Sequence, residues 1–188
     1  MNFFRKIQNY FLKKSKDKFI YPEYGNYRGS GCIFTDGKHI LAGYQKKGSQ
    51  SYISGIGGKT KDEESYIQTA IREMIEEILE TKDVSPKLIK QIEETVEPRH
   101  IYRNRFYINV VYSFDDLVTI LKIIHKNGIK TNLYKSFPKT VNDLVFNRIT
   151  PSNSEISHLC ILPLVKHNTD YDFIDLSFIT DMQILLNS

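Results

Sequence analysis

Three glutamates, Glu73, Glu76 and Glu77, lie within little more than one turn of a predicted helix. Like charges three and four residues apart on a helix repel each other, and the sequence places no lysine between Glu63 and Thr81 to offset them. The repulsion between clustered carboxylates of this kind is usually offset by a hard divalent cation that prefers oxygen ligands, such as Mg²⁺, Mn²⁺ or Ca²⁺. The alternative interpretation is a solvated acidic helix face.

A glycine-rich loop comes directly before this helix and contains Gly55, Gly57 and Gly58. Glycine permits close backbone approach and positive φ angles, and a helix N-terminus that follows a glycine turn is a place where phosphate oxygens bind. Arg72 is the only cationic residue of the helix, and it can pair with Glu64 to hold the loop against the helix. The stretch therefore predicts a site for phosphate and metal together.

The sequence indicates where this helix begins and which of its faces is buried. Ser65 is a good N-cap, and Gln68 completes a capping box. The following apolar residues recur at helical spacing and form the expected buried stripe: Ile67, Ala70, Ile71, Met74, Ile75 and Ile78. The acidic side chains are expected on the opposite side: Glu73, Glu76, Glu77 and Glu80.

This stretch resembles the Nudix box, G-x5-E-x7-R-E-U-x-E-E-x-G-U, in which U is aliphatic. The residues that occupy box positions at the required spacing are Gly58, Glu64, Arg72, Glu73, Met74, Glu76 and Glu77. Two positions depart from the box, because Leu79 replaces its glycine and Glu80 replaces its last aliphatic residue. Glycine ends helices, so we expect Leu79 to let the helix run another turn toward Lys82.

The resemblance to Nudix hydrolases implies a metal-dependent enzyme that cleaves a diphosphate linkage. The implied ligands of Mg²⁺ or Mn²⁺ are the carboxylates of Glu73, Glu76 and Glu77 and the backbone carbonyl of Gly58. Glu64 with Arg72 would hold the glycine loop in place. The general base would be either Glu77 or Glu155, which stands just before a late strand-like stretch, "EISHLCILPL", of a kind that Nudix proteins often have.

Strand and helix patterns are interspersed along the rest of the chain. Asp36-Gly37 is a strong hairpin signal between two strand-like runs, and Phe106, Ile108 and Val110 alternate as in a central strand, on one face with Tyr112. The other expected elements are a helix after Pro86, amphipathic helices over residues 115–128 and 175–186, and a buried strand over residues 156–164. With the resemblance, we expect an α/β protein with a Nudix-type α/β/α sandwich around a mixed sheet over residues 21–188, with a helical insertion at about 113–154.

The net charge of +4 is concentrated at the N-terminus, where residues 1–18 hold six lysines and arginines against one aspartate. Phenylalanines, tyrosine and isoleucine recur there at helical spacing, so residues 1–20 read as a basic amphipathic helix. Such a helix can pack on the domain with a solvated basic face. It can instead contact RNA phosphates, or act as a presequence or a membrane-surface helix.

Two further groups of side chains are candidates for substrate contact. Arginine suits bidentate phosphate contacts and tyrosine suits base stacking. The candidates are Arg99, Tyr102, Arg103 and Arg105 before the strand near residue 106, and Tyr44, Lys46 and Lys47 before the glycine loop. The alternative for each group is a solvated strand end.

Three functions remain open at this point. The leading hypothesis is hydrolysis of capped RNA 5′ ends (decapping), because a basic arm and clustered arginines suit a long polyanion. The alternatives are a nucleotide-sanitising pyrophosphatase for oxidised nucleoside triphosphates and a Nudix-fold binding protein without catalysis. The composition, which is rich in lysine, asparagine, isoleucine and tyrosine, also resembles that of Nudix proteins of large DNA viruses.

Cysteine usage and hydropathy indicate the cellular setting. Cys32 and Cys160 both lie in strand-like apolar runs, so we expect buried free thiols and a reducing, cytoplasmic environment. The sequence has no apolar run near the roughly 18 residues that a membrane span needs.

Overall fold

The predicted hairpin at Asp36-Gly37 is confirmed. A computed structural model describes residues 22–47, 50–149, 154–165 and 173–188. In it β1 (Gly29–Thr35) and β2 (His39–Lys47) pair antiparallel. Gly37 takes a φ of 84°, and Asp36 Oδ1 accepts hydrogen bonds from the backbone nitrogens of Lys38 and His39 at 2.8 and 2.7 Å. These bonds are the local reason that the chain turns here.

The hairpin lies in the middle of a seven-stranded mixed sheet with the order β3-β2-β1-β6-β5. In addition, β4 pairs with β1, and β7 pairs with β2. All pairs are antiparallel except β1 with β6. The remaining strands are β3 (Gln50–Ser54), β4 (Ile56–Lys59), β5 (His100–Asn104), β6 (Tyr107–Ser113) and β7 (Ile156–Pro163).

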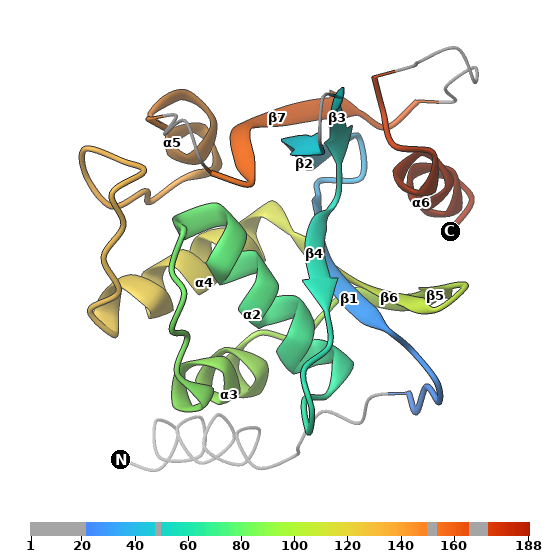
Figure 1. Ribbon diagram of the computed structural model, residues 1–188, viewed down its shortest axis with the longest axis horizontal. Helices are drawn as coiled ribbons and strands as arrows, with labels where there is room; N and C mark the ends of the chain where they lie inside the picture. Colours follow the sequence, from blue (N-terminus) through green and yellow to red (C-terminus); the bar gives the residue numbers. More distant parts are fainter. Residues whose placement is uncertain (1–21, 48–49, 150–153, 166–172) are drawn as a thin grey trace, which may run out of the picture.

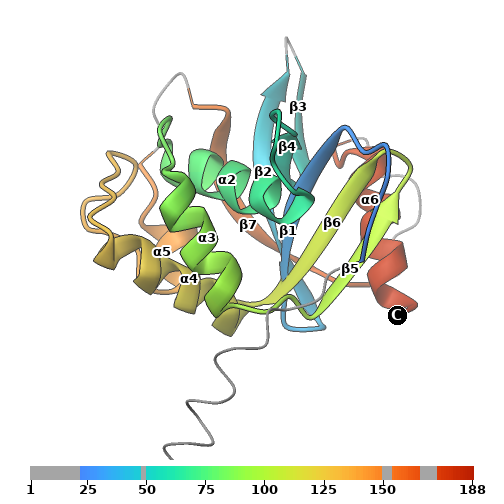
Figure 2. The ribbon, with the colours of Figure 1, turned by 90° about the horizontal axis from the view of Figure 1, so that it is seen from below.

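Helices cover both faces of this sheet, and Figure 1 shows α2, α3 and α4 together on one side and α6 on the other. The view in Figure 2, turned by 90°, shows the same separation. Because β1 is covered on both sides, Phe34 packs in the core with α2 while its neighbour Ile33 packs in the second core with α6. The helices are α2 (Tyr66–Leu79), α3 (Pro86–Thr95), α4 (Phe114–Lys126), α5 (Val141–Phe146) and α6 (Leu176–Leu186). The expected α/β/α sandwich around a mixed sheet is therefore confirmed.

The structure corrects the expected end of the acidic helix. Helix α2 ends at Leu79, and Glu80 takes the left-handed conformation (φ 52°, ψ 45°) that usually favours glycine. Leu79 is completely buried, which explains why a leucine stands where the box has glycine. The turn has moved one residue further along the chain, and the helix does not run toward Lys82.

Two further expectations need adjustment. Strand β7 is only half buried, with Ile156 and Leu159 inside and Ile161 exposed. Phe106 is also exposed, because it lies in the turn between β5 and β6 and not in the strand. Both cysteines are free thiols, as expected, although Cys160 is only partly buried.

The segment predicted as an insertion contributes to the main core. Leu117, Ile120 and Leu121 of α4 and Leu144 of α5 are buried in the same cluster as the residues of α2. The basic N-terminal segment, residues 1–20, lies outside the described residues. None of the described helices is long and apolar enough to cross a membrane.

Candidate functional site

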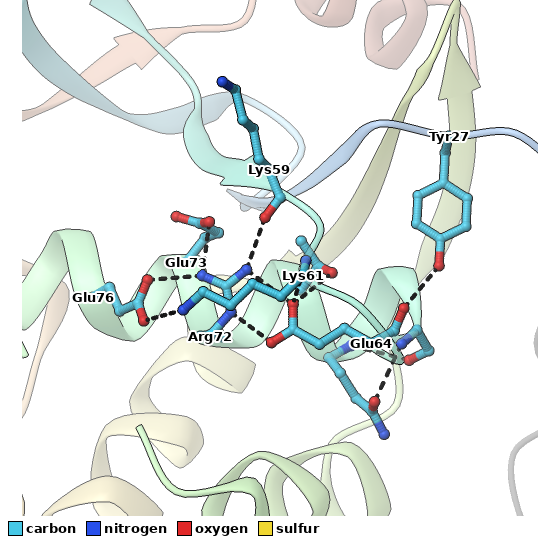
Figure 3. A network of polar contacts seen from close by, with 10 residues as sticks. Tyr27, Lys59, Lys61, Glu64, Arg72, Glu73 and Glu76 are labelled. Carbon is cyan, nitrogen blue, oxygen red and sulfur yellow. Dashed lines mark hydrogen bonds and ion pairs between the residues drawn. The ribbon is translucent and has the colours of Figure 1, made fainter. Parts of the chain in front are cut away.

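Arg72 is the centre of the acidic site (Figure 3). Its Nε and Nη2 donate to the two carboxylate oxygens of Glu64 at 2.6 and 2.9 Å, and Nη2 also donates to the carbonyl of Lys59 at 2.8 Å. Its Nη1 donates to Glu73 Oε1 at 2.7 Å and Glu76 Oε2 at 2.8 Å. Arg72 is only 3% exposed. The predicted pair with Glu64 is present, and the same guanidinium also holds two of the expected metal ligands.

Glu64 joins the loop to the start of α2. Its Oε2 accepts hydrogen bonds from the Lys61 backbone nitrogen at 3.2 Å and from Thr69 Oγ1 at 3.1 Å, and its backbone carbonyl accepts from the Tyr27 hydroxyl at 3.0 Å. Burial alone would raise the pKa of Glu64, but the hydrogen bonds from Arg72 and its neighbours outweigh burial and lower the pKa. Glu64 is therefore held as a charged anchor of the loop.

Glu77 is buried, which corrects the expectation that it lies opposite the buried stripe. It is 8% exposed, and its Oε2 accepts a hydrogen bond from the Gly57 backbone nitrogen at 2.8 Å. Burial, followed by the nearby charge of Glu155, raises its pKa well above the ordinary value, and the Gly57 N–H opposes this only in part. The two candidate general bases thus lie within electrostatic range of each other.

Glu73 lies directly against Gly58. A Cβ added at Gly58 would come within 2.5 Å of the Glu73 carboxyl carbon, so a larger residue would displace this carboxylate. Burial raises the pKa of Glu73 although Arg72 opposes the shift. The Gly58 carbonyl oxygen lies beside Gly29 of the paired strand, where a Cβ at Gly29 would collide with it.

The donor set of this site fits a hard divalent cation. Only oxygen atoms are offered, and Glu73 Oε2 and Glu77 Oε1 accept no hydrogen bond from any described residue. The described part of the chain nevertheless contains no preassembled group of three metal-ligating side chains. Instead, Arg72 Nη1 holds one oxygen of Glu76, and the exposed Lys61 approaches its other oxygen at 3.3 Å. A cation that used Glu76 would take the place of Lys61 Nζ.

A cavity of about 680 Å³ lies on the other side of the glycine strand β4. Gly57 and Gly58 line it from one side, and both also contact the glutamates of α2. Gly57 has a φ of 152°, and a Cβ there would collide with the Tyr107 hydroxyl and the Gly31 backbone. Strand β4 is therefore a thin partition between the acidic helix and the cavity, and only glycine fits at its centre.

The structure places the predicted substrate-binding residues of the arginine-rich stretch near β5 in different surroundings. Arg105 lines the cavity, and Tyr102 is buried in the core under α6. Arg103 donates to the backbone carbonyls of Gly25, Asn26 and Arg105 and so fastens the chain before β1. Arg103 and Tyr102 therefore have structural roles in the described protein.

Arg99 lies at the far end of this hairpin from Arg105. It pairs with Asp116 at 3.0 Å in the first turn of α4 and does not line the cavity.

Tyr44 and Lys46 are exposed on β2 and do not line the cavity, whereas Gln45 between them does. Lys47 ends β2, and its side chain lies outside the described part of the protein. Glu155 is exposed immediately before β7.

Several cavity residues were not identified from the sequence. Arg28 precedes β1, and Asn104 and Asn109 come from the two strands of the β5–β6 hairpin. Asp181 comes from α6. The signal for Asp181 was present, because it is the only charged residue of a mostly apolar helical stretch, "FITDMQILL". The other three carry no local signal.

Comparisons with known proteins give structural likeness only, since no family model and no curated protein matches. A bifunctional NMN adenylyltransferase/ADP ribose pyrophosphatase from Francisella tularensis is 16% identical with a TM-score of 0.47, and the match covers 100% of this chain and 46% of that one. The present chain thus spans less than half of that protein. A NUDIX hydrolase from Nitrosomonas europaea is 11% identical with a TM-score of 0.45, covering 86% and 88% of the two chains. The Nudix hydrolase RenU from M. smegmatis is 11% identical with a TM-score of 0.44, covering 89% and 88%.

Proposed function

We propose that this chain is a metal-dependent Nudix hydrolase that cleaves a nucleoside diphosphate linkage. One observation carries the proposal: the residues of the box form a single connected unit around the glycine strand. Arg72 holds Glu64, Glu73 and Glu76, and Glu77 holds the Gly57 backbone. A cavity large enough for a nucleotide lies on the other side of the same strand.

Each residue of the unit has a definable task. Glu73, Glu76 and Glu77 would hold Mg²⁺ or Mn²⁺, which supplies charge neutralisation at the diphosphate and activation of water. Arg72 and Glu64 position the loop and keep Glu73 and Glu76 on the correct side of the helix. Glu77 or Glu155 would accept the proton of the attacking water, and the charge of Glu155 contributes to the raised pKa of Glu77.

For the substrate, we propose capped RNA, with a free nucleoside triphosphate as the alternative. Capped RNA is supported by the positive charge of residues 1–18 and by Arg28 and Arg105 at the cavity. The smaller substrate is favoured by a different observation. Arg99 and Arg103, which were expected to contact a long polyanion, are occupied by contacts within the chain.

The reaction class is tested with a substrate panel assayed in Mg²⁺ and in Mn²⁺. The panel contains capped RNA, free cap dinucleotide, oxidised dGTP, ADP-ribose and diadenosine polyphosphates. We expect turnover of at least one member, and Glu77→Gln should lower it by at least about 100-fold, because a lost metal ligand costs several kcal/mol of charge stabilisation. Glu80→Gln is the matched control on the exposed end of the same helix. Absence of turnover with every substrate and metal would instead support a binding protein without catalysis.

A truncation separates the two substrates. Deleting residues 1–18 should weaken capped-RNA binding and flatten its salt dependence by roughly 0.7 in log–log slope for each lost single-strand phosphate contact. Cleavage of a free cap dinucleotide should change little. Thermal melting must first show that the truncated protein is folded. An unchanged RNA affinity and salt slope would remove the main support for capped RNA and favour the triphosphate.

A further inference from the structure

Asp181 is a buried carboxylate that the proposed chemistry does not use. It lies on α6, is 8% exposed, and lines the cavity on the side away from the acidic helix. No lysine, arginine or histidine among the described residues forms an ion pair with it. A buried carboxylate without a cationic partner is costly to the fold, so its presence in a cavity wall points to a ligand that supplies further donors.

Two asparagine amides fix the orientation of this carboxylate. Asn104 Nδ2 and Asn109 Nδ2 both donate to Asp181 Oδ1 at 2.9 Å. A carboxylate only accepts, so both amide nitrogens must face it and both amide oxygens face elsewhere. The Tyr102 hydroxyl donates to the Asp181 backbone carbonyl at 3.4 Å, which holds this turn of α6 against the sheet, and it lies near enough to the carboxyl group to lower its pKa.

This arrangement leaves a corner of the cavity that offers acceptors. Both amides converge on Oδ1, so Oδ2 of Asp181 has no amide donor, and each asparagine brings its side-chain carbonyl oxygen as a further acceptor beside the second N–H of its amide. Burial raises the pKa of Asp181 to about 6 although the amides and Tyr102 oppose the shift. At neutral pH the carboxylate is therefore largely charged and accepts hydrogen bonds. The corner suits a ligand edge with two adjacent N–H donors.

Other cavity residues indicate that the ligand also carries phosphate and a flat ring. Arg28, Lys59 and Arg105 line the same cavity, and so do the aromatic rings of Phe106 and Phe178. The guanidinium of Arg28 lies 5.0 Å from the centre of the Phe106 ring. Basic groups suit phosphate oxygens, and aromatic or guanidinium planes suit base stacking.

We propose that Asp181, oriented by Asn104 and Asn109, binds the N1–H and 2-amino edge of a guanine base. Among the common bases, guanine alone presents two adjacent donors on its pairing edge. Adenine and cytosine each place an acceptor next to their amino group, and uracil places acceptors on both sides of its N–H. Asp181 is thus a specificity-determining residue. The inference rests on the proposed function in taking a nucleotide as the ligand.

The test measures nucleotide binding by calorimetry with EDTA present, so that it does not depend on turnover. GMP should bind at least about tenfold more tightly than IMP, which lacks the 2-amino group, or 1-methyl-GMP, which lacks the N1–H, because a hydrogen bond to a charged acceptor contributes about 1.5–3 kcal/mol. AMP should bind more weakly than GMP by a similar factor. 7-methyl-GMP keeps both donors, and whether it exceeds GMP separates a capped end from a free guanine nucleotide as the source of the base.

The variant Asp181→Asn gives the sharpest comparison. Its Oδ1 can still accept from both asparagines, but the second oxygen becomes an N–H donor, so the preference for GMP over IMP should disappear. Asp115→Asn removes the same charge from an exposed position on α4 and should keep that preference. Melting curves check that both variants fold, and the wild-type comparison of GMP with 1-methyl-GMP stands without any variant.

The outcomes separate this inference from the proposed function. Equal affinities of wild-type protein for GMP, IMP and 1-methyl-GMP would overturn the guanine site even if diphosphate turnover is observed. A clear preference for GMP without turnover of any substrate would leave the guanine site standing and refute the hydrolase. Retention of the full GMP preference in a folded Asp181→Asn protein would also overturn the role of Asp181.

Discussion

Arg148 Nη1 donates a hydrogen bond to the backbone carbonyl of Ile78 at 2.7 Å, in the last turn of the acidic helix. The same guanidinium donates through Nη2 to the carbonyls of Glu77 at 3.2 Å and Ile156 at 2.8 Å. The last carbonyls of a helix lack partners within the helix, and here Arg148 supplies them. It also ties the end of α2, where Glu77 lies, to the start of β7, where Glu155 lies.

The first prediction concerns the hydrogen bonds that Arg148 donates to the end of α2 and the start of β7. Arg148→Met should lower the free energy of unfolding by about 2–4 kcal/mol, because buried carbonyls would lose a charged donor. Arg99→Met is the matched control: its exposed ion pair with Asp116 should contribute less than about 1 kcal/mol. Urea denaturation measures both variants. Equal effects at the two positions would show that Arg148 does not fasten the helix.

The end of α2 gives the second prediction. Leu79→Gly should destabilise the protein by about 3 kcal/mol or more, because Leu79 is fully buried and its removal leaves a cavity. Glu80→Gly should stabilise it by about 1 kcal/mol, since Glu80 has a φ of 52°. Glu80→Ala removes the same charge without relieving the backbone. Thermal melting that ranks Glu80→Ala level with Glu80→Gly would contradict the backbone explanation.

Neighbouring glycines should respond differently to substitution, which is the third prediction. Gly57→Ala should lose several kcal/mol of stability, because its Cβ would meet the Gly31 backbone and the Tyr107 hydroxyl. Gly58→Ala meets the end of the flexible Glu73 side chain, so it should fold but bind metal more weakly. Melting and Mn²⁺ titration followed by electron paramagnetic resonance distinguish the two effects. A Gly57→Ala protein as stable as wild type would contradict the close packing.

Metal binding itself is the fourth prediction. The wild-type protein should bind Mn²⁺, and Glu73→Gln or Glu76→Gln should each weaken binding at least about tenfold, because each removes a charged oxygen ligand. Lys61→Met should bind Mn²⁺ more tightly than wild type, since Lys61 Nζ approaches Glu76 at 3.3 Å and competes for it. Glu80→Gln serves as the control for loss of a nearby charge. Weaker binding by Lys61→Met would argue against this competition.

The fifth prediction is a pH dependence of stability that arises from Asp181. Its pKa is about 6 in the folded protein and near 3.8 as a free side chain. Between these values the folded state keeps a proton that the unfolded state has released, so wild-type stability should fall by about 2 kcal/mol as pH rises from 4 to 6. Asp181→Asn lacks this loss, so its stability relative to wild type should increase across that interval. Denaturation at pH 4 and pH 7 measures the difference, with Asp115→Asn as the control.

Residue spacing along single elements was enough to predict much of the site. The capping box at Ser65 and Gln68 and the pair of Arg72 with Glu64 are present as the sequence indicated. These features depend on residues less than three helical turns apart, whose relative positions follow from helix geometry. The hairpin at Asp36-Gly37 is local in the same sense.

Tertiary structure alone decided which side chains surround the cavity. Asp181 meets Asn104 and Asn109 across 77 and 72 residues of chain, and Arg148 meets Ile78 across 70. Arg103 was expected to face substrate, yet it fastens residues before β1. Sequence patterns record the period of one helix or strand. Which surfaces then pack together depends on the burial of the whole chain, so the contacts among the box residues could be predicted from the sequence while the walls of the cavity could not.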